Sequence, residues 1–264
     1  MKSITGERFK GRIVIFVWLC VIFFIWQEIS FILADVAKDK MAPRTLPYLH
    51  YIILNLLTRG SLIFSHAGQT LSRALIGFLF GAGVGFLLAL AMSLAGIVER
   101  MLFPYLLISQ MIPILGLAPI LAGIIGNIGQ TRAFIAAFIT FFPVAVNTLA
   151  GFKNVEPEKL TLTYSLAADK FTVYRKLMIP AALPFLFSGL KIAAPMAITA
   201  AILVDTLGGA SGLGYLITYS LYGGFPIMVF WSTVLLSAVL GILSYQAIVV
   251  IERICMPYKY GGSE

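Results

Sequence analysis

The sequence predicts an all-α polytopic membrane protein. Of its 264 residues, 60% are hydrophobic and 11% are charged, and the mean hydropathy is +0.97. Soluble domains carry roughly 25% charged residues, and a water-soluble fold of this length could not bury so much apolar surface. The apolar residues form continuous runs rather than the short alternating segments of a β-barrel. We therefore expect helices that cross the bilayer.

About six runs are long and apolar enough to be spans, since a spanning helix takes about 20 residues. They are Ile13–Ala34, Leu71–Ile97, Leu102–Ile125, Arg132–Leu149, Leu183–Thr206 and Ile227–Ile251. The first run follows a basic stretch, as in a signal peptide, but Trp26-Gln27-Glu28 stands where a small-residue cleavage site would be. It is therefore expected to be a retained helix.

Two of these runs contain residues that shape helices. Gly77, Gly81 and Gly85 share one face of the second run, which favours close helix packing within one subunit or between two. Pro113 and Pro119 are expected to break the third run, and both are candidates to border a solute pathway. Between the first two runs, apolar residues at helical spacing in Pro47–Ser65 predict an interfacial amphipathic helix. Whether residues 46–65 are partly inserted stays open.

The lysines and arginines predict the orientation of the chain. With the N-terminus inside, twelve lie in inner segments and five in outer ones, the five being Lys38, Lys40, Arg44, Arg59 and Arg132. This asymmetry favours both termini in the cytoplasm. The net charge of +8 is thereby explained by the lipid bilayer, and nucleic acid is not expected as a partner.

One sizeable polar segment, Asn154–Lys176, interrupts the apolar sequence and is predicted to face the cytoplasm. Its order suggests a short helix over Glu158–Ser165 and a second over Thr172–Met178, bounded by turns at Pro157 and Pro180. The segment is too polar to span the membrane and too short to be a catalytic domain. We expect it to dock a soluble motor.

The sequence offers little chemistry of its own. Gly209-Ala210-Ser211-Gly212 matches a short intramembrane-protease pattern, but both histidines, His50 and His66, precede the serine, and a glycine-rich turn explains it equally well. There is no Walker A sequence, so the chain should not hydrolyse ATP. Asp205 could line a pathway or cap the following helix, and Lys191 could line a pathway or snorkel to the inner interface.

The segment and its flanks resemble the permease subunits of binding-protein-dependent ABC importers. Alignment on Pro180 places the family's loop acid at Thr161 and its glycine at Ala167. Other runs are similar to the nitrate, sulfonate, taurine and thiamine-precursor type, namely Gly60 to Phe78, Phe141 to Gly151, Pro180 to Lys191 and Gly212 to Ile217. The loop departs from the family where the acid and the glycine are missing.

The resemblance implies a type I ABC importer permease fold, with a cytoplasmic coupling helix between helices 4 and 5. It implies one transmembrane permease domain over 1–264, in which 1–59 forms an N-terminal helix and a periplasmic or interfacial segment and 60–264 the permease core. The implied ATPase-coupling residues are Glu158, Thr161, Ser165, Ala167, Ala168, Asp169, Lys170 and Pro180.

The same resemblance implies three partners: an ATP-binding cassette subunit, an extracytoplasmic solute-binding protein and a second permease subunit, identical or paralogous. No cofactor or metal is expected on this chain, because ATP and Mg²⁺ would belong to the ATP-binding subunit. The chain would be a non-catalytic subunit that forms the pathway for a small molecule, with a stand-alone carrier or channel as the alternative.

Overall fold

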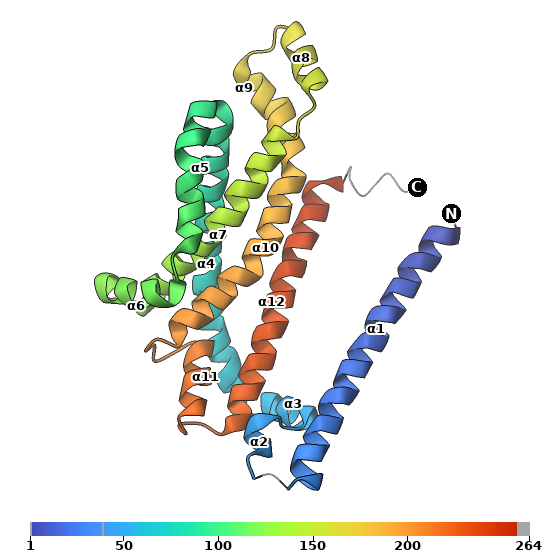
Figure 1. The fold of residues 1–264 in the computed structure, drawn as a ribbon, viewed down its shortest axis with the longest axis vertical. Helices are drawn as coiled ribbons and strands as arrows, with labels where there is room; N and C mark the ends of the chain where they lie inside the picture. Colours follow the sequence, from blue (N-terminus) through green and yellow to red (C-terminus); the bar gives the residue numbers. More distant parts are fainter. Residues whose placement is uncertain (1, 39, 258–264) are drawn as a thin grey trace. The chain divides into compact units, whose positions relative to one another are not determined.

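The structure, a computed structural model, describes residues 2–38 and 40–257, without the side chains of residues 2–12, 15, 16, 19, 42 and 43. This part of the chain is helical, as predicted, and contains no strand. Figure 1 shows the order of the elements, which are α1 (Lys2–Phe31), the π-helical turn Ile32–Val36, α2 (Ala42–Thr45), α3 (Leu49–Thr58), α4 (Gly60–Leu94), α5 (Gly96–Met111), α6 (Ile114–Ile125), α7 (Ile128–Lys153), α8 (Pro157–Ser165), α9 (Lys170–Val173), the π-helical turn Tyr174–Met178, α10 (Ile179–Asp205), α11 (Leu213–Leu221) and α12 (Ile227–Cys255).

Four described helical stretches are long and apolar enough to cross a membrane: Gly60–Leu94, Ile128–Lys153, Lys170–Asp205 and Ile227–Cys255. The bent pair α5 and α6 makes a fifth if it forms one span. These stretches cover most of the second to sixth predicted runs. The first predicted run lies almost wholly in α1, and the total of six spans stays a prediction.

The chain divides into two compact units, one of residues 1–63 and 217–234 and the other of residues 64–216 and 235–264. In the first unit, the indole nitrogen of Trp26 donates to the carbonyl of Pro47 at 2.9 Å, and the hydroxyl of Ser232 donates to the carbonyl of Ile52 at 2.9 Å. These bonds tie α1 and the start of α12 to the region of α3. The second unit holds the candidate site residues.

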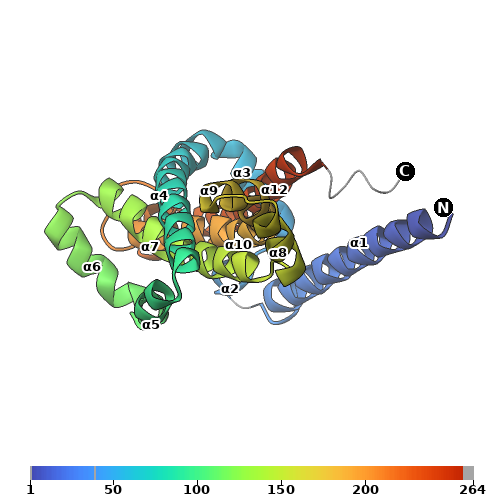
Figure 2. The same cartoon turned by 90° about the horizontal axis from the view of Figure 1, so that it is seen from above.

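α7 forms the centre of the second unit, between α4 and α10 (Figure 2). Added Cβ atoms at Gly77, Gly81 and Gly85 would collide with the α7 backbone at Ala133, Ala137 and Phe141 respectively. The glycine stripe therefore packs within the chain, which is one of the two arrangements that the sequence left open. Each step of four on α4 matches a step of four on α7, so the two helices run in the same direction.

The third predicted run breaks at Pro113 but not at Pro119. Ile112 and Pro113 are both extended, with φ and ψ of −72° and 119° and of −69° and 114°. Proline disfavours the helical region for the residue before it, and the two extended residues bend α5 against α6 by 95°. Pro119 lies inside α6, where its missing N–H removes one hydrogen bond without ending the helix.

The predicted interfacial helix over Pro47–Ser65 is too long at its C-terminal end. The helix α3 covers Leu49–Thr58 and buries Ile52, but residues 60–65 already belong to α4. At Arg59 the backbone leaves the helical region, with φ −109° and ψ 18°, and this residue separates the two helices. The long helix thus begins eleven residues before the predicted start of the second span at Leu71.

Candidate functional site

The polar segment between α7 and α10 contains the predicted short helix. α8 runs from Pro157 to Ser165, with Pro157 in its first turn, where a proline loses no intrahelical bond. No residue of α8 is buried. Of the proposed coupling residues, Glu158, Thr161, Ser165, Ala167, Asp169 and Lys170 are exposed and Ala168 is half-buried.

α8 ends in a left-handed residue at Ala167, which has φ +54°. The N–H of Ala167 donates to the carbonyl of Tyr164 at 2.9 Å, and the N–H of Ala168 donates to the carbonyl of Thr163 at 3.3 Å. This pair of bonds is the Schellman motif, in which glycine is the usual left-handed residue. Ala167 is the position that aligns with the family glycine, so the conformation persists where the glycine does not.

The helix after Ala168 continues through Pro180, contrary to the predicted turn there. A single helical stretch runs from Lys170 to Asp205. Just before the proline, the N–H of Ile179 donates to the carbonyl of Tyr174, five residues back, in a π-helical turn over Tyr174–Met178. Such a turn widens the helix just before Pro180. In a regular α-helix the ring of this proline would clash with the preceding turn. The second half of the polar segment, from Lys170 onward, is therefore continuous with a transmembrane helix.

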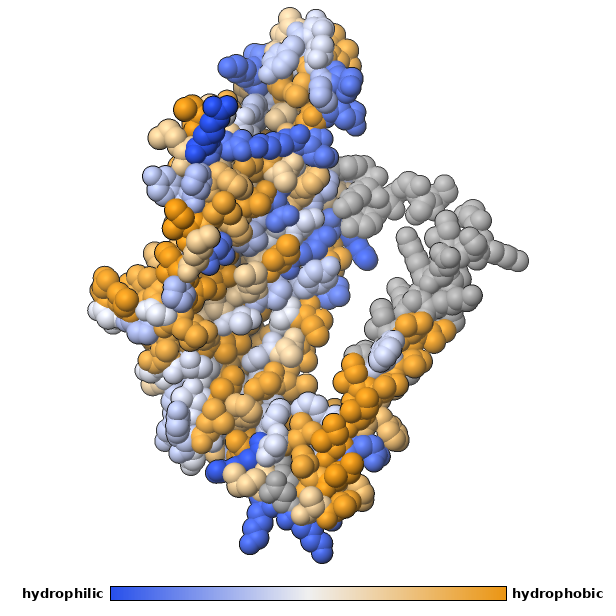
Figure 3. All heavy atoms as spheres, in the orientation of Figure 1, coloured by the Kyte–Doolittle hydropathy of each residue, from blue (hydrophilic) through white to orange (hydrophobic). Residues whose placement is uncertain are grey.

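The tip of this segment combines polar and apolar side chains. Figure 3 shows hydrophilic residues gathered over α8 and α9, with hydrophobic ones among them. The exposed apolar residues are Leu162 (62% exposed), Leu166 (75%) and Phe171 (70%). At the base of the segment Val173 is buried, and the hydroxyl of Tyr174 donates to the carbonyl of Ser93 at 2.8 Å. The base of the segment is therefore fixed to the rest of the unit, and the side chains at its tip are accessible to a partner.

The polar groups of the segment are largely satisfied within it. The hydroxyl of Thr161 donates to the carbonyl of Pro157 at 3.0 Å, and that of Ser165 to the carbonyl of Thr161 at 2.9 Å. The hydroxyl of Thr172 donates to the carboxylate of Asp169 at 2.5 Å, and this hydrogen bond lowers the pKa of Asp169. The exposed side chains of Leu162, Leu166 and Phe171 have no polar group to satisfy and are available to a partner.

Asp205 lies in a buried polar network at the other end of α10. Its carboxylate pairs with the guanidinium of Arg132 from α7, and the two side chains are 0% and 4% exposed. The hydroxyl of Thr70 from α4 donates to the same carboxylate at 2.6 Å. A nitrogen of Arg132 also donates to the carbonyl of Ser211 at 2.5 Å. The network joins three helices and the loop before α11.

The same network holds the start of α11, whose first N–H groups have no intrahelical partner. The N–H groups of Gly212, Leu213 and Gly214 donate in turn to His66 Nδ1 at 2.9 Å, Thr70 Oγ1 at 2.9 Å and Asp205 Oδ2 at 3.4 Å.

The structure leaves no room for side chains at Gly212 and Gly214. A Cβ at Gly212, which has φ +101°, would collide with the carboxylate of Asp205, and one at Gly214 would collide with the carbonyl of Ile202. The glycines of the Gly212–Ile217 run thus serve close packing and a tight turn. The hydrogen bond that the N–H of Gly214 donates to the carboxylate of Asp205 is the capping interaction that the sequence offered as one of two roles.

Lys191 pairs with Glu252 of α12, and their nitrogen and oxygen are 2.5 Å apart. The lysine side chain is 18% exposed and the glutamate side chain is 0% exposed. Sequence reasoning missed this partner, because Glu252 falls one residue beyond the predicted sixth run. It also counted Arg132 as an outer loop charge. An acid within an apolar span requires a cation nearby, and that requirement is the signal that could have linked Arg132 to Asp205.

Pro113 borders an apolar cavity of about 480 Å³ between the α5–α6 bend, α7 and α10. Its other lining residues are Ile114, Leu115, Ile139, Pro195, Met196, Thr199, Ala200 and Leu203. Of the four pathway candidates, only Pro113 is among these residues. Asp205 and Lys191 make ion pairs elsewhere in the unit, and Pro119 lies further along α6.

Comparisons with known proteins agree with this architecture. Residues 77–254 match the family described as binding-protein-dependent transport system inner membrane component. The chain is 34% identical over 199 residues to the formylaminopyrimidine transport permease protein ThiX of Halalkalibacterium halodurans, covering 75% of this chain and 79% of that protein. It is 26% identical over 242 residues to the putative aliphatic sulfonates transport permease protein SsuC of Bacillus subtilis, covering 90% and 85%.

Solved structures show the same fold at low sequence identity. An amino acid ABC transporter chain superposes with a TM-score of 0.63 at 16% identity, covering 76% of this chain and 97% of that one. An inward-facing methionine ABC transporter chain superposes with a TM-score of 0.58 at 21% identity and the same coverage. The match over most of the chain, the relatives and the fold lead to one conclusion: the chain belongs to the family of binding-protein-dependent transport system inner membrane components, the permease subunits of ABC importers.

Proposed function

We propose that this permease couples to its ATP-binding subunit through α8 and the residues up to Lys170, which together form its coupling segment. One observation carries the proposal: no residue of α8 is buried, and only residues 166–169 separate it from the single helical stretch Lys170–Asp205, which belongs to the membrane core. A rigid stretch of this kind can transmit movement of a docked subunit to the core, as in a two-state rigid-body switch.

The contact with the ATP-binding subunit would be mainly apolar. Thr161 replaces the family's loop acid, and its hydroxyl is bonded within α8. Leu162, Leu166 and Phe171 are exposed instead, and buried apolar anchors contribute most to protein interfaces. We expect a hydrophobic groove on the partner, with Asp169 and Lys170 at its rim.

The pathway would run along the α5–α6 bend, α7 and α10, where the cavity at Pro113 lies. The cavity is lined by apolar side chains and one threonine, Thr199, so it selects against a bare anion such as nitrate. A second permease subunit would complete the pathway, and a binding protein would deliver the solute on the extracytoplasmic face.

We propose a nitrogen heterocycle of the thiamine-precursor class as the solute. Two relatives at 30% identity or more carry names of nitrogen heterocycles, the formylaminopyrimidine permease of Halalkalibacterium halodurans and the riboflavin permease RibX of Chloroflexus aurantiacus, and the first of these names a pyrimidine. The taurine permease TauC of Escherichia coli is 24% identical. The apolar cavity supports the same choice, because flat heterocycles can be desolvated at lower cost than small anions.

The proposed orientation keeps both termini in the cytoplasm of the bacterial plasma membrane. This orientation rests on the count of lysines and arginines in inner and outer segments. Arg132 no longer belongs in the outer count, because it forms a buried ion pair and does not lie in an exposed loop. The remaining outer lysines and arginines are Lys38, Lys40, Arg44 and Arg59, against twelve inner ones. The asymmetry is therefore larger than the sequence alone indicated.

Purification of the tagged permease from native membranes tests the function. We expect an ATP-binding subunit to copurify, and proteoliposomes containing the complex and its binding protein to accumulate labelled formylaminopyrimidine only with ATP. Excess taurine or nitrate should not compete. Accumulation by the permease alone without ATP would instead identify a stand-alone carrier, and competition by taurine would overturn the substrate class but not the coupling.

A further inference from the structure

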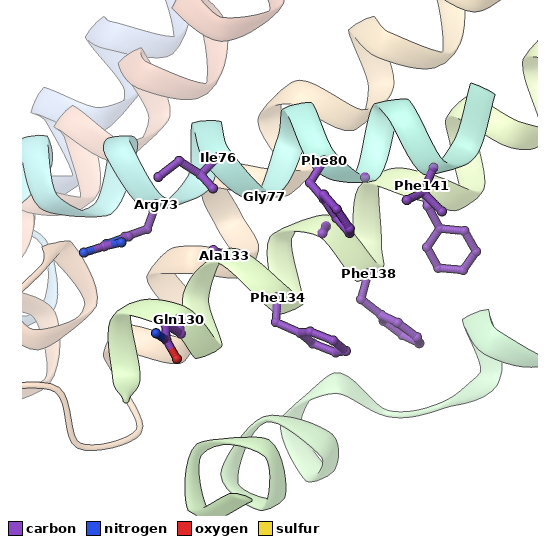
Figure 4. Close-up of a pocket in the computed structure, with 12 residues that line it drawn as sticks. Arg73, Ile76, Gly77, Phe80, Gln130, Ala133, Phe134, Phe138 and Phe141 are labelled. Atoms are coloured by element: carbon purple, nitrogen blue, oxygen red, sulfur yellow. The ribbon is translucent and has the colours of Figure 1, made fainter. Parts of the chain in front are cut away.

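A second cavity, of about 440 Å³, lies on the face between α4 and α7, away from the α8 segment and the cavity at Pro113 (Figure 4). Its floor is made by the glycine stripe, Gly77 and Gly81, against Ala133 and Ala137. Phenylalanines and aliphatic residues form the walls. The side chains in the walls are Ile76, Phe80, Val84, Phe134, Phe138 and Phe141.

One end of this groove is polar. The guanidinium of Arg73 lies there, next to Gln130 in the first turn of α7. A Cβ placed at Gly129 would be 3.3 Å from Nε of Arg73, so the arginine lies against the beginning of α7. Within the part of the chain that the structure describes, none of the ion pairs includes Arg73, and the groove is lined by no carboxylate.

The dimensions of the groove match one leaflet of a bilayer. From Arg73 to Val84, α4 rises about 16 Å at 1.5 Å per residue, which is about half of the ~30 Å hydrocarbon core. The polar end lies where α7 begins, at the boundary of the spanning region, and the phenylalanines extend from it toward the middle of the helices. The groove is open along its walls, since Phe80 is 69% exposed and Phe134 is 48% exposed.

We propose that this groove binds an anionic phospholipid, with the phosphate beside Arg73 and Gln130 and one acyl chain along the phenylalanines. An intramembrane cation without a protein partner is costly unless it meets an anion, and arginine pairs with phosphate through two parallel hydrogen bonds. The lipid would also fill the space that the close α4–α7 approach leaves between their larger side chains.

The test uses the intact transporter in nanodiscs of phosphatidylcholine with a small share of phosphatidylglycerol that carries a photoreactive diazirine on its acyl chain. Mass spectrometry locates the labelled peptides. We expect the label to concentrate on residues 76–84 and 134–141. Arg73→Gln should lower it about fivefold, the value of one arginine beside an anionic lipid, while Arg73→Lys and the exposed control Arg100→Gln retain it.

Val84→Trp, which fills the inner end of the groove, should exclude the acyl chain and lower the labelling without removing a charge. Equal labelling by a phosphatidylcholine probe, or unchanged labelling in Arg73→Gln, would overturn the proposal. A Phe80→Cys variant checks the competing occupant. If it forms a disulfide-linked pair of permeases in the native membrane, then a second copy covers the groove and the lipid proposal is wrong.

Discussion

Arg132 and Asp205 form an ion pair in the interior of the second unit, with side chains that are 4% and 0% exposed. The pair connects α7 to the end of α10, and through Thr70 and Ser211 it extends to α4 and to the loop before α11. Removing one charge from a buried pair leaves the other without compensation, which costs more than the pair contributes. Asp205 is thus placed to hold the helices together.

We therefore expect Asp205→Asn to destabilise the protein by about 3–5 kcal/mol, the usual result of breaking a buried pair. The melting temperature in detergent and the yield of inserted protein should both fall. Asp169→Asn serves as a control, because Asp169 is exposed. Normal stability together with altered uptake kinetics in Asp205→Asn would show instead that the residue acts in the pathway.

Ala167→Gly should stabilise the end of α8. An L-residue in the left-handed region costs about 1–2 kcal/mol, and Ala167 has φ +54°. Hydrogen exchange of the amides at Ala167 and Ala168 should slow in the glycine variant and quicken in Ala167→Val. Ala168→Gly provides the matched control and should give no protection, because Ala168 does not have a positive φ.

The Lys191–Glu252 pair gives a double-mutant test. Lys191→Met leaves a fully buried carboxylate without this partner and should lower the free energy of unfolding by about 3 kcal/mol. Lys191→Met with Glu252→Gln should be less destabilised than the sum of the two single variants, with a coupling of about 0.5–3 kcal/mol. Strictly additive effects on thermal stability would mean that the pair is not formed in the membrane.

Charge reversal at the rim of the coupling segment should uncouple transport. We expect the Asp169→Lys, Lys170→Asp double variant to insert normally but to lose ATP-dependent uptake, because both residues are exposed beside the apolar tip. Asp169→Asn keeps an acceptor for Thr172, so it removes the negative charge while retaining that hydrogen bond. Full uptake by the double variant, measured per inserted molecule, would exclude a role for these charges in docking.

The sequence predicted helices wherever local signals were strong. Pro157 marks the start of α8, and most of each apolar run from Leu71 onward lies in a described helix. The sequence-based prediction misplaced those helix boundaries that depend on tertiary context. Pro180 reads locally as a stop, but a π-helical turn accommodates it. Residues 60–65 join α4, although the interruptions at Asn55 and Arg59 had favoured an interfacial helix over Pro47–Ser65.

The polar contacts could be predicted less well than the helices. Asp205 stood out as an acid in an apolar run, but its partners Arg132, Thr70 and the N–H of Gly214 come from three other parts of the chain. Their pairing depends on the packing of α4, α7 and α10, and one sequence does not reveal helix neighbours. For Ala167 a signal was present, because its alignment with a family glycine could have indicated the left-handed conformation that the structure shows.

Charge on the apolar tip provides a further test of docking. Leu166→Asp should reduce recovery of the ATP-binding subunit about tenfold or more, the effect of losing a buried anchor worth over 1.4 kcal/mol. Leu207→Asp adds the same charge at the opposite end of α10 and should not change recovery. Equal recovery in both variants would mean that the partner does not bury Leu166.

The central claim, that α8 contacts the ATP-binding subunit, is tested most directly by site-specific crosslinking in the intact complex. Cys20 and Cys255 are both exposed and are first replaced by serine. A photocrosslinker on Ser165→Cys should then join the permease to the ATP-binding subunit, and the same probe on Leu207→Cys should not. Copurification of the ATP-binding subunit without any crosslink from Ser165→Cys, but with one from Leu207→Cys, would contradict the account.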